Sequence, residues 1–181
     1  KGLQLTLRDD RDLEDTTGET FLYEGGISEY VKFINQGKTP IHENVIHLEG
    51  TEDNVVFEVA LQYNTSYNEN IYSFVNNINT HDGGTHEEGV KRALTRLVNN
   101  YARKSNMLKE KDESLTGEDV KEGLTMIVSC KHPNPQFEGQ TKGRLGNSEV
   151  RKLADSVFSK GFDRFLMENP NEAKIIVEKA M

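Results

Sequence analysis

Short apolar runs, some of them strictly alternating with polar residues, fill the first half of the chain and predict strands. Such runs cover residues 3–7, 21–24, 41–48, 55–63 and 71–78. In the run 55–63 every second side chain is apolar, which places these side chains on one face of a strand. The segment 49–54 is rich in turn-forming residues. A strand-rich first half with hairpin-like connections is therefore expected.

Apolar residues at helical spacing predict four helices. These segments cover residues 26–37, 85–104, 147–168 and 170–181. In the first, apolar residues follow Ile27 at i+3, i+4 and i+7. Pro170 occupies the first helical position of the last one, where a missing N–H is harmless. A strand at 124–130 separates the second helix from the third, so the order predicts a crossover that joins neighbouring strands of one sheet.

The start of the second predicted helix carries a local signal. Residues 85–88, Thr-His-Glu-Glu, match a capping box, in which the threonine hydroxyl and a glutamate carboxylate satisfy free N–H groups. The glycine pair 83–84 before it is expected to form a turn, and an anion cradle at the helix N-terminus is the alternative. His81 and His86 lack the spacing of a helical zinc motif, so no metal site is predicted.

Length and composition narrow the class of protein. The 181 residues suit one domain, or one domain with a trailing helix. A formal net charge of −8 argues against a surface that binds nucleic acid everywhere, but it leaves room for a local basic stripe. The single cysteine, Cys130, falls in an apolar strand, so a buried thiol and no disulfide are expected. No apolar run reaches membrane-span length and no signal pattern is present, so a cytoplasmic protein is expected.

The first residues predict that this is an excised piece of a longer protein. Lys1 is not a natural initiator, and a strand pattern follows it at once.

A glycine-rich loop at 136–149 carries the most informative chemistry. Its three glycines permit sharp turns and a close approach of the backbone to a ligand. One amide, Gln140, and one ammonium, Lys142, lie among them. A lysine at such a tip can reach a terminal phosphate as a compact point charge. Spacing alone leaves a solvated basic loop as the open alternative.

Basic residues also gather on the second predicted helix, on the face opposite its apolar stripe. They are Arg92, Arg96 and Arg103, flanked by Lys91 and Lys104. A solvated face and a contact with DNA phosphates both remain open, because phosphate contacts need only positive charge.

Four stretches, in one order, resemble the ATPase subunit of bacterial type IIA topoisomerases. They are residues 23–31, residues 76–87, Gly123 with the strand after it, and Gln140-Thr-Lys142 followed by Leu145-Gly-Asn-Ser-Glu149. The resemblance spans essentially the whole chain. It implies an α+β fold of the ribosomal-protein-S-five-domain-two-like transducer type. That fold has a mixed sheet, a βαβ crossover of the uncommon left hand and long C-terminal helices.

The resemblance also implies three parts. Residues 1–18 would form the end of a preceding ATPase domain and a linker, residues 19–168 the transducer domain, and residues 169–181 the start of a helix leading to the cleavage core. Within the family, the short connection 131–137 resembles the gyrase branch. The topoisomerase IV branch stays open as the alternative.

Site residues follow from the resemblance as expectations. Gln140 and Lys142 would hold the γ-phosphate of ATP in the neighbouring domain, with Lys142 as the catalytic residue that stabilises the transferring phosphoryl group. Lys91, Arg92 and Arg96 would face the cavity through which a DNA duplex passes.

The implied function is to couple ATP binding and hydrolysis to gate closure and strand passage, which gives negative supercoiling in the gyrase branch. ATP and Mg²⁺ would serve the full-length enzyme, and this chain alone would bind neither and be inactive. Implied partners are the upstream ATPase domain, the downstream cleavage domain, the gyrase A subunit and duplex DNA. The whole protein would be a homodimer and the isolated chain a monomer. A nucleic-acid-binding module of the same fold, without a nucleotide role, remains a further alternative.

Overall fold

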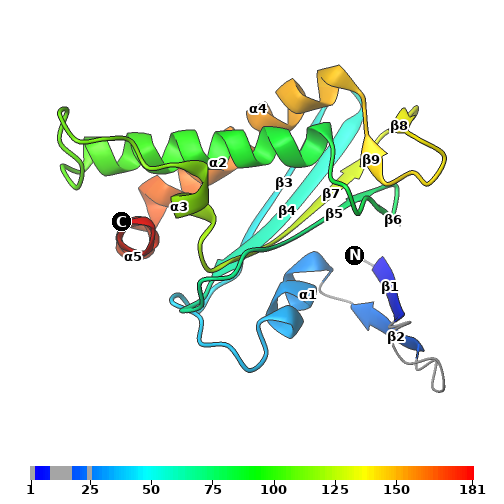
Figure 1. The fold of residues 1–181 in the computed structure, drawn as a ribbon, viewed down its shortest axis with the longest axis horizontal. Helices are drawn as coiled ribbons and strands as arrows, with labels where there is room; N and C mark the ends of the chain where they lie inside the picture. Colours follow the sequence, from blue (N-terminus) through cyan, green and yellow to red (C-terminus); the bar gives the residue numbers. More distant parts are fainter. Residues whose placement is uncertain (1–2, 9–17, 24–25) are drawn as a thin grey trace.

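A five-stranded mixed sheet forms the centre of the computed structural model, which describes residues 3–8, 18–23 and 26–181 (Figure 1). Its strands, in spatial order, are β3 (Ile46–Glu52), β4 (Val55–Tyr63), β7 (Leu124–Lys131), β5 (Asn70–Val75) and β6 (Ile78–Asn79). Antiparallel pairing joins all neighbours except β5 and β7, which run parallel. The expected mixed sheet is therefore confirmed.

Helices cover both faces of this sheet. On one face lie α2 (Thr85–Lys104), α3 (Gly117–Lys121), α4 (Ser148–Glu168) and α5 (Pro170–Ala180), whereas α1 (Ile27–Ile34) lies on the other (Figure 1). All four helices predicted from apolar spacing are present. The short α3 was not predicted; its own capping box, between Thr116 and Asp119, provides a local signal for it.

Alternation along β4 explains how one strand serves two cores. Its odd-numbered residues, from Val55 to Tyr63, pack with α2 and α4 in the larger hydrophobic cluster. Ala60 points the other way and packs with α1. This division follows from the alternation itself, because successive side chains of a strand point to opposite faces. Cys130 on the adjacent β7 is fully buried, and burial raises the pKa of its thiol to about 12, as the predicted inert thiol requires.

Two predicted strand boundaries are wrong, and tight turns explain both. The run 41–48 forms a strand only from Ile46, and β3 continues through most of the expected turn as far as Glu52. The reversal needs only Asp53 and Asn54, which have φ of 50° and 64°. Likewise, the single strand expected at 71–78 is a hairpin, because the pair 76–77 has φ of 48° and 66°. Two successive positive φ values suit the twist of two-residue hairpins.

The expected crossover is also present. β5 and β7 are parallel neighbours, and the chain between them passes through β6, α2 and α3. Its left hand stays a prediction.

Two further strand pairs complete the described chain. β1 (Leu3–Arg8) pairs with β2 (Gly18–Tyr23), which agrees with strands expected near residues 3–7 and 21–24. Of the linker predicted at residues 9–18, residues 9–17 lie outside the described residues, and Gly18 is the first residue of β2. β8 (Phe137–Glu138) and β9 (Arg144–Leu145) form a small hairpin that the sequence did not predict as strands. In the part of the chain that the structure describes, no helix is long and apolar enough to cross a membrane.

A buried network of amides holds α1 against the sheet. Asn35, which caps the C-terminus of α1, donates to Gln62 Oε1 at 2.8 Å. Its Oδ1 accepts from Asn64 Nδ2 at 3.1 Å and from Thr125 Oγ1 at 2.7 Å. These four side chains are at most 5% exposed. Asn35 thus bonds to each of the other three side chains, so its removal leaves buried polar groups without these partners.

Asn35→Ala should therefore lower the free energy of unfolding by about 2–3 kcal/mol, the cost of unsatisfied buried donors and acceptors. Urea unfolding followed by circular dichroism measures this change. The matched control, Asn100→Ala, removes an exposed amide on α2 and should change stability by less than about 0.5 kcal/mol. Equal effects of the two substitutions would contradict a stabilising network at Asn35.

Candidate functional site

The central part of the glycine-rich loop, residues 139–143, forms the tip of the β8–β9 hairpin, at the end of the molecule opposite α5 (Figure 1). Gln140 and Lys142 are exposed there. The Lys142 ammonium lies 6.0 Å from the centre of the Phe137 ring, at the outer limit of a cation–π contact. Neither residue forms a hydrogen bond or ion pair with any part of the chain that the structure describes. Their donors are thus available to an external anion.

The base of this hairpin, in contrast, is fixed to the N-terminus of α2. The Leu145 N–H donates to the Gly83 carbonyl at 3.2 Å, and the Asp82 N–H donates to the Gly143 carbonyl at 2.8 Å. Leu145 is fully buried. Gly84 has φ of 140°, and a Cβ there would lie 2.5 Å from the Leu145 nitrogen. The glycine pair therefore lets two backbones meet, which confirms a structural turn, and the hairpin occupies the place of the alternative anion cradle.

The predicted capping box at 85–88 is wrong. Gly84 is the N-cap residue, and no side chain caps α2. The Thr85 hydroxyl is buried without a partner among the described residues. Glu87 accepts from Ser73 at 2.8 Å and pairs with Lys91, so its carboxylate is used between β5 and α2. Glu88 turns toward two arginines instead.

These two arginines connect the hairpin with α4. Arg144 of β9 donates to Glu88 Oε1 and to the Asp82 carbonyl. Arg151 of α4 donates to Glu88 Oε2 from Nε at 3.0 Å and from Nη2 at 2.7 Å. Partial burial would raise the pKa of Glu88, but the hydrogen bonds and charges of Arg151 and Arg144 outweigh it and lower that pKa. Glu88 is therefore a carboxylate between two guanidinium groups.

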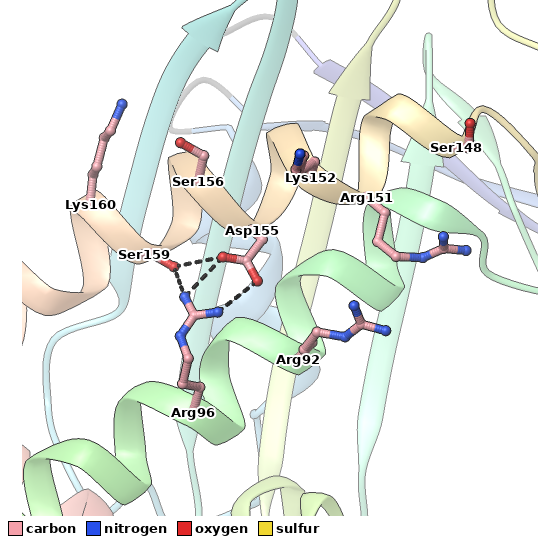
Figure 2. Close-up of a pocket in the computed structure, with 9 residues that line it drawn as sticks. All are labelled: Arg92, Arg96, Ser148, Arg151, Lys152, Asp155, Ser156, Ser159 and Lys160. Atoms are coloured by element: carbon pink, nitrogen blue, oxygen red, sulfur yellow. Dashed lines mark hydrogen bonds and ion pairs between the residues drawn. The ribbon is translucent and has the colours of Figure 1, made fainter.

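A basic groove of about 650 Å³ opens between α2 and α4 (Figure 2). The helices cross closely because Gly89 faces α4, where a Cβ would come within 2.3 Å of the Arg151 carbonyl oxygen. Five basic side chains line the groove together with Asp155 and three serines. The five are Arg92, Arg96, Arg151, Lys152 and Lys160. Figure 2 shows Arg92 and Arg151 projecting in the same direction from the two helices.

The two predicted arginines of the groove are held differently. Arg96 donates to both oxygens of Asp155 at 2.9 Å and to Ser159 Oγ at 2.6 Å (Figure 2). The hydrogen bond and charge of Arg96 lower the pKa of Asp155. Arg92 forms no hydrogen bond or ion pair among the described residues, so its guanidinium is the more available one.

The structure separates the remaining predicted cations from this groove. Lys91 points to the other side of α2, where it pairs with Glu87 at 2.5 Å and Glu69 at 3.9 Å. Arg103 donates to the carbonyls of Lys109 and Asp112 and fixes the loop after α2. The basic face expected on α2 is thus divided: some of its cations line the groove, and others pair elsewhere.

Sequence reasoning missed the contribution of α4 to the groove. Arg151, Lys152 and Lys160 come from a helix whose apolar stripe is evident in the sequence, and they occupy its polar side. Their spacing along that helix is the signal that could have indicated them. Only the crossing of α2 and α4 brings them beside Arg92.

Of the two histidines near the start of α2, His86 lies in the interior. His86 is fully buried and lies 3.1 Å from Thr80 Oγ1. Burial lowers the pKa of His86 to about 4, so its ring stays neutral near pH 7. Among the described residues, no three or more histidine, cysteine, aspartate or glutamate side chains are grouped to hold a metal ion.

Comparisons with solved structures first define the class of protein. The ATPase domain of Thermus thermophilus gyrase B, solved with an aminocoumarin, superimposes with a TM-score of 0.82 at 38% identity, over 98% of this chain and 47% of that one. The ATP-binding domain of Francisella tularensis topoisomerase IV superimposes with a TM-score of 0.74 at 24% identity, over 98% and 46% of the two chains. The second likeness shows the fold alone. The fold is therefore that of slightly less than half of such an ATPase region.

The particular family follows from the sequence comparisons. The family model described as DNA gyrase B matches residues 26–181. The B subunit of DNA gyrase from Bacillus mycoides is 56% identical over 179 residues, which are 99% of this chain and 44% of the relative. The chain belongs to the DNA gyrase B family, as the resemblance implied. It spans less than half the length of this relative.

Gly84→Ala should lower the free energy of unfolding by about 3 kcal/mol or more, because strained φ and a backbone clash with Leu145 act together. Gly37→Ala is the matched control. Gly37 also has positive φ, at 80°, but no atom within 4 Å of an added Cβ, so only about 1 kcal/mol is expected from the conformation. Urea unfolding measures both, and a cost at Gly84 no larger than at Gly37 would contradict the docking of the hairpin there.

Proposed function

We propose that this chain is the transducer domain of a DNA gyrase B subunit, whose β8–β9 hairpin contributes Gln140 and Lys142 to the γ-phosphate site of ATP. One observation carries the proposal: an ammonium and an amide without polar partners in the described chain stand at the exposed tip of a hairpin whose base is fixed to α2. Family membership gives the context in which such a tip would meet a nucleotide.

The donor set fits a terminal phosphate. Lys142 supplies three N–H donors and a full positive charge, and the Gln140 amide supplies two further donors. Positive φ at Gly139 and Lys142, 79° and 56°, bends the loop so that residues 140–142 form its tip. The nucleotide supplies the phosphoryl group, and the residues of this chain hold and orient it. We assign Mg²⁺ no residue of the described chain.

The chemistry would rest on a difference in charge before and after the reaction. Lys142 would stabilise the charge that develops on the transferring phosphoryl group, while Gln140 orients that group through its amide. Lys142 has a strong partner while the γ-phosphate is present and loses it after phosphate release. That difference in interaction free energy could shift the orientation of the domain. The docked hairpin and α4 form the rigid route for such a movement.

The domain division and the partners belong to the same proposal. Residues 1–18 would end the ATPase domain, 19–168 would form the transducer, and 169–181 would begin the helix toward the cleavage core. The upstream ATPase domain, the downstream cleavage domain, the gyrase A subunit and duplex DNA are the proposed partners. The proposed outcome is gate closure and strand passage driven by ATP.

The groove between α2 and α4 supports a role in holding DNA. Its arginines and lysines can contact phosphates without reading sequence. Arg92 and Arg96 remain proposed contacts, now with Arg151, Lys152 and Lys160 of α4. Lys91 was also expected there, but its two ion pairs lie away from the groove. We therefore propose that Lys91 is structural.

Lys142→Ala in the full-length protein should lower the kcat of ATP hydrolysis by about a hundredfold, the loss typical for one donor to a developing negative charge. Binding of a non-hydrolysable ATP analogue should be retained in part. Lys179→Ala is the matched control, because the Lys179 ammonium also lies over an aromatic ring, Tyr67, at 5.0 Å. Turnover near the unaltered value in the Lys142 variant would refute the phosphate role and favour a nucleic-acid-binding module without nucleotide chemistry.

Arg92→Ala should weaken binding of a short mixed-sequence duplex and reduce the slope of log affinity against log salt by about one unit. Fluorescence anisotropy over a range of salt concentrations measures this slope. Arg164→Ala is the control, because Arg164 is an arginine of α4 that pairs with Glu168 and does not line the groove. An unchanged slope in the Arg92 variant would remove this residue from the DNA contact.

A further inference from the structure

Glu88 contacts both parts of the proposed site: the β8–β9 hairpin and the groove between α2 and α4. Its Oε1 accepts from Arg144, which follows Lys142 by two residues on the hairpin. Its Oε2 accepts from Arg151, which lines the basic groove. One carboxylate thus lies between the loop proposed to meet ATP and the surface proposed to meet DNA.

Glu88, Arg144 and Arg151 form a junction of charged side chains. The contacts of Arg144 show why this junction would control the hairpin. Arg144 also donates to the Asp82 carbonyl at 3.1 Å and pairs with Glu138 of β8 at 3.2 Å. It therefore reaches both strands of the hairpin and the turn before α2. The three side chains of the junction are 35–41% exposed, so solvent screens each pair, but charge-assisted hydrogen bonds in a network are stronger than isolated surface pairs.

Glu88 competes for Arg151 with an anion that approaches the Nε and Nη2 edge of its guanidinium group. The Nε and Nη2 groups of Arg151 are already used by Glu88, so a phosphate that takes these donors must displace the carboxylate. Both oxygens of Glu88 would then be free for Arg144, and the phosphate would take over the neutralisation of Arg151. Arg144 would consequently be held more firmly against α2.

We propose that Glu88 is a positioning residue that couples the groove to the hairpin: a nucleic-acid phosphate that binds Arg151 releases Glu88 to Arg144 and thereby tightens the base of the loop that carries Lys142. This inference rests on the proposed function, because it requires phosphates in the groove. Because the duplex must displace Glu88 from Arg151, the Glu88 carboxylate also lowers the affinity of the groove for the duplex.

Hydrogen exchange of this chain, with and without a short mixed-sequence duplex, tests the coupling. In the unaltered chain, the duplex should slow amide exchange in residues 137–145 by about fivefold, at the low end of allosteric coupling. Glu88→Gln should abolish this slowing, yet bind the duplex as tightly or more tightly, because the competing charge is gone. If Glu88 had a purely structural role, its substitution would not separate the exchange response from duplex affinity in this way.

Two further variants complete the test. Arg144→Gln leaves the groove and Arg151 in place and should also abolish the slowing. Glu168→Gln removes an ion pair with Arg164 at the far end of α4 and should retain it. If Glu88→Gln or Arg144→Gln keeps the full response to the duplex, the coupling is refuted, but the proposed role of the groove in DNA binding is not. If the unaltered chain does not bind the duplex, the groove is refuted and the coupling with it, whereas the phosphate role of Lys142 is judged separately by ATP turnover.

Discussion

The close crossing of α2 and α4 at Gly89 is the constraint on which the rest of this structure depends. A Cβ at that position would lie 2.3 Å from the Arg151 carbonyl oxygen, so the two backbones meet at a distance that only glycine permits. The crossing places Glu88 beside Arg151 and brings two sets of basic side chains to one groove. It also seals the cluster in which Val90, Leu94 and Phe158 pack against the sheet. The same helix crossing thus determines both the packing of the core and the positions of the charged side chains.

The hairpin combines a fixed base with an exposed tip, and this division suits a sensing element. Leu145 is buried and bonded to the backbone of Gly83 just before α2, whereas the Lys142 ammonium lies over the Phe137 ring at 6.0 Å, without a polar partner in the described chain. A rigid base transmits displacement, because packed interiors do not deform continuously. A tip without intrachain polar partners need not break a hydrogen bond before it meets an anion. The same loop would lose this advantage if Lys142 were paired within the chain.

Apolar periodicity predicted every long helix and most strands, because burial on one face is a local property of the sequence. The hairpin at Asn76-Asn77 was missed, since an apolar run on both sides of a two-residue turn looks like one strand. The capping box at Thr85 failed because the tertiary contact with Leu145 took over the helix start. The groove could not be predicted from one helix, since three of its five basic side chains come from α4. The glycines, amide and ammonium of its loop made Lys142 a candidate, but its phosphate role came from the family resemblance and stays a prediction.

Local charge in the groove has to act against the net charge of −8 of the chain. The Debye length of about 8 Å at physiological salt means that a bound phosphate responds mainly to charges within the groove. There, Asp155 and Glu88 neutralise Arg96 and Arg151 in part, and in doing so fix the orientation of both guanidinium groups. Arg92 and Lys152 form no such ion pair among the described residues. The groove therefore combines oriented cations, which are partly neutralised, with available ones. This combination favours weak, salt-sensitive contact with the phosphates of the proposed duplex.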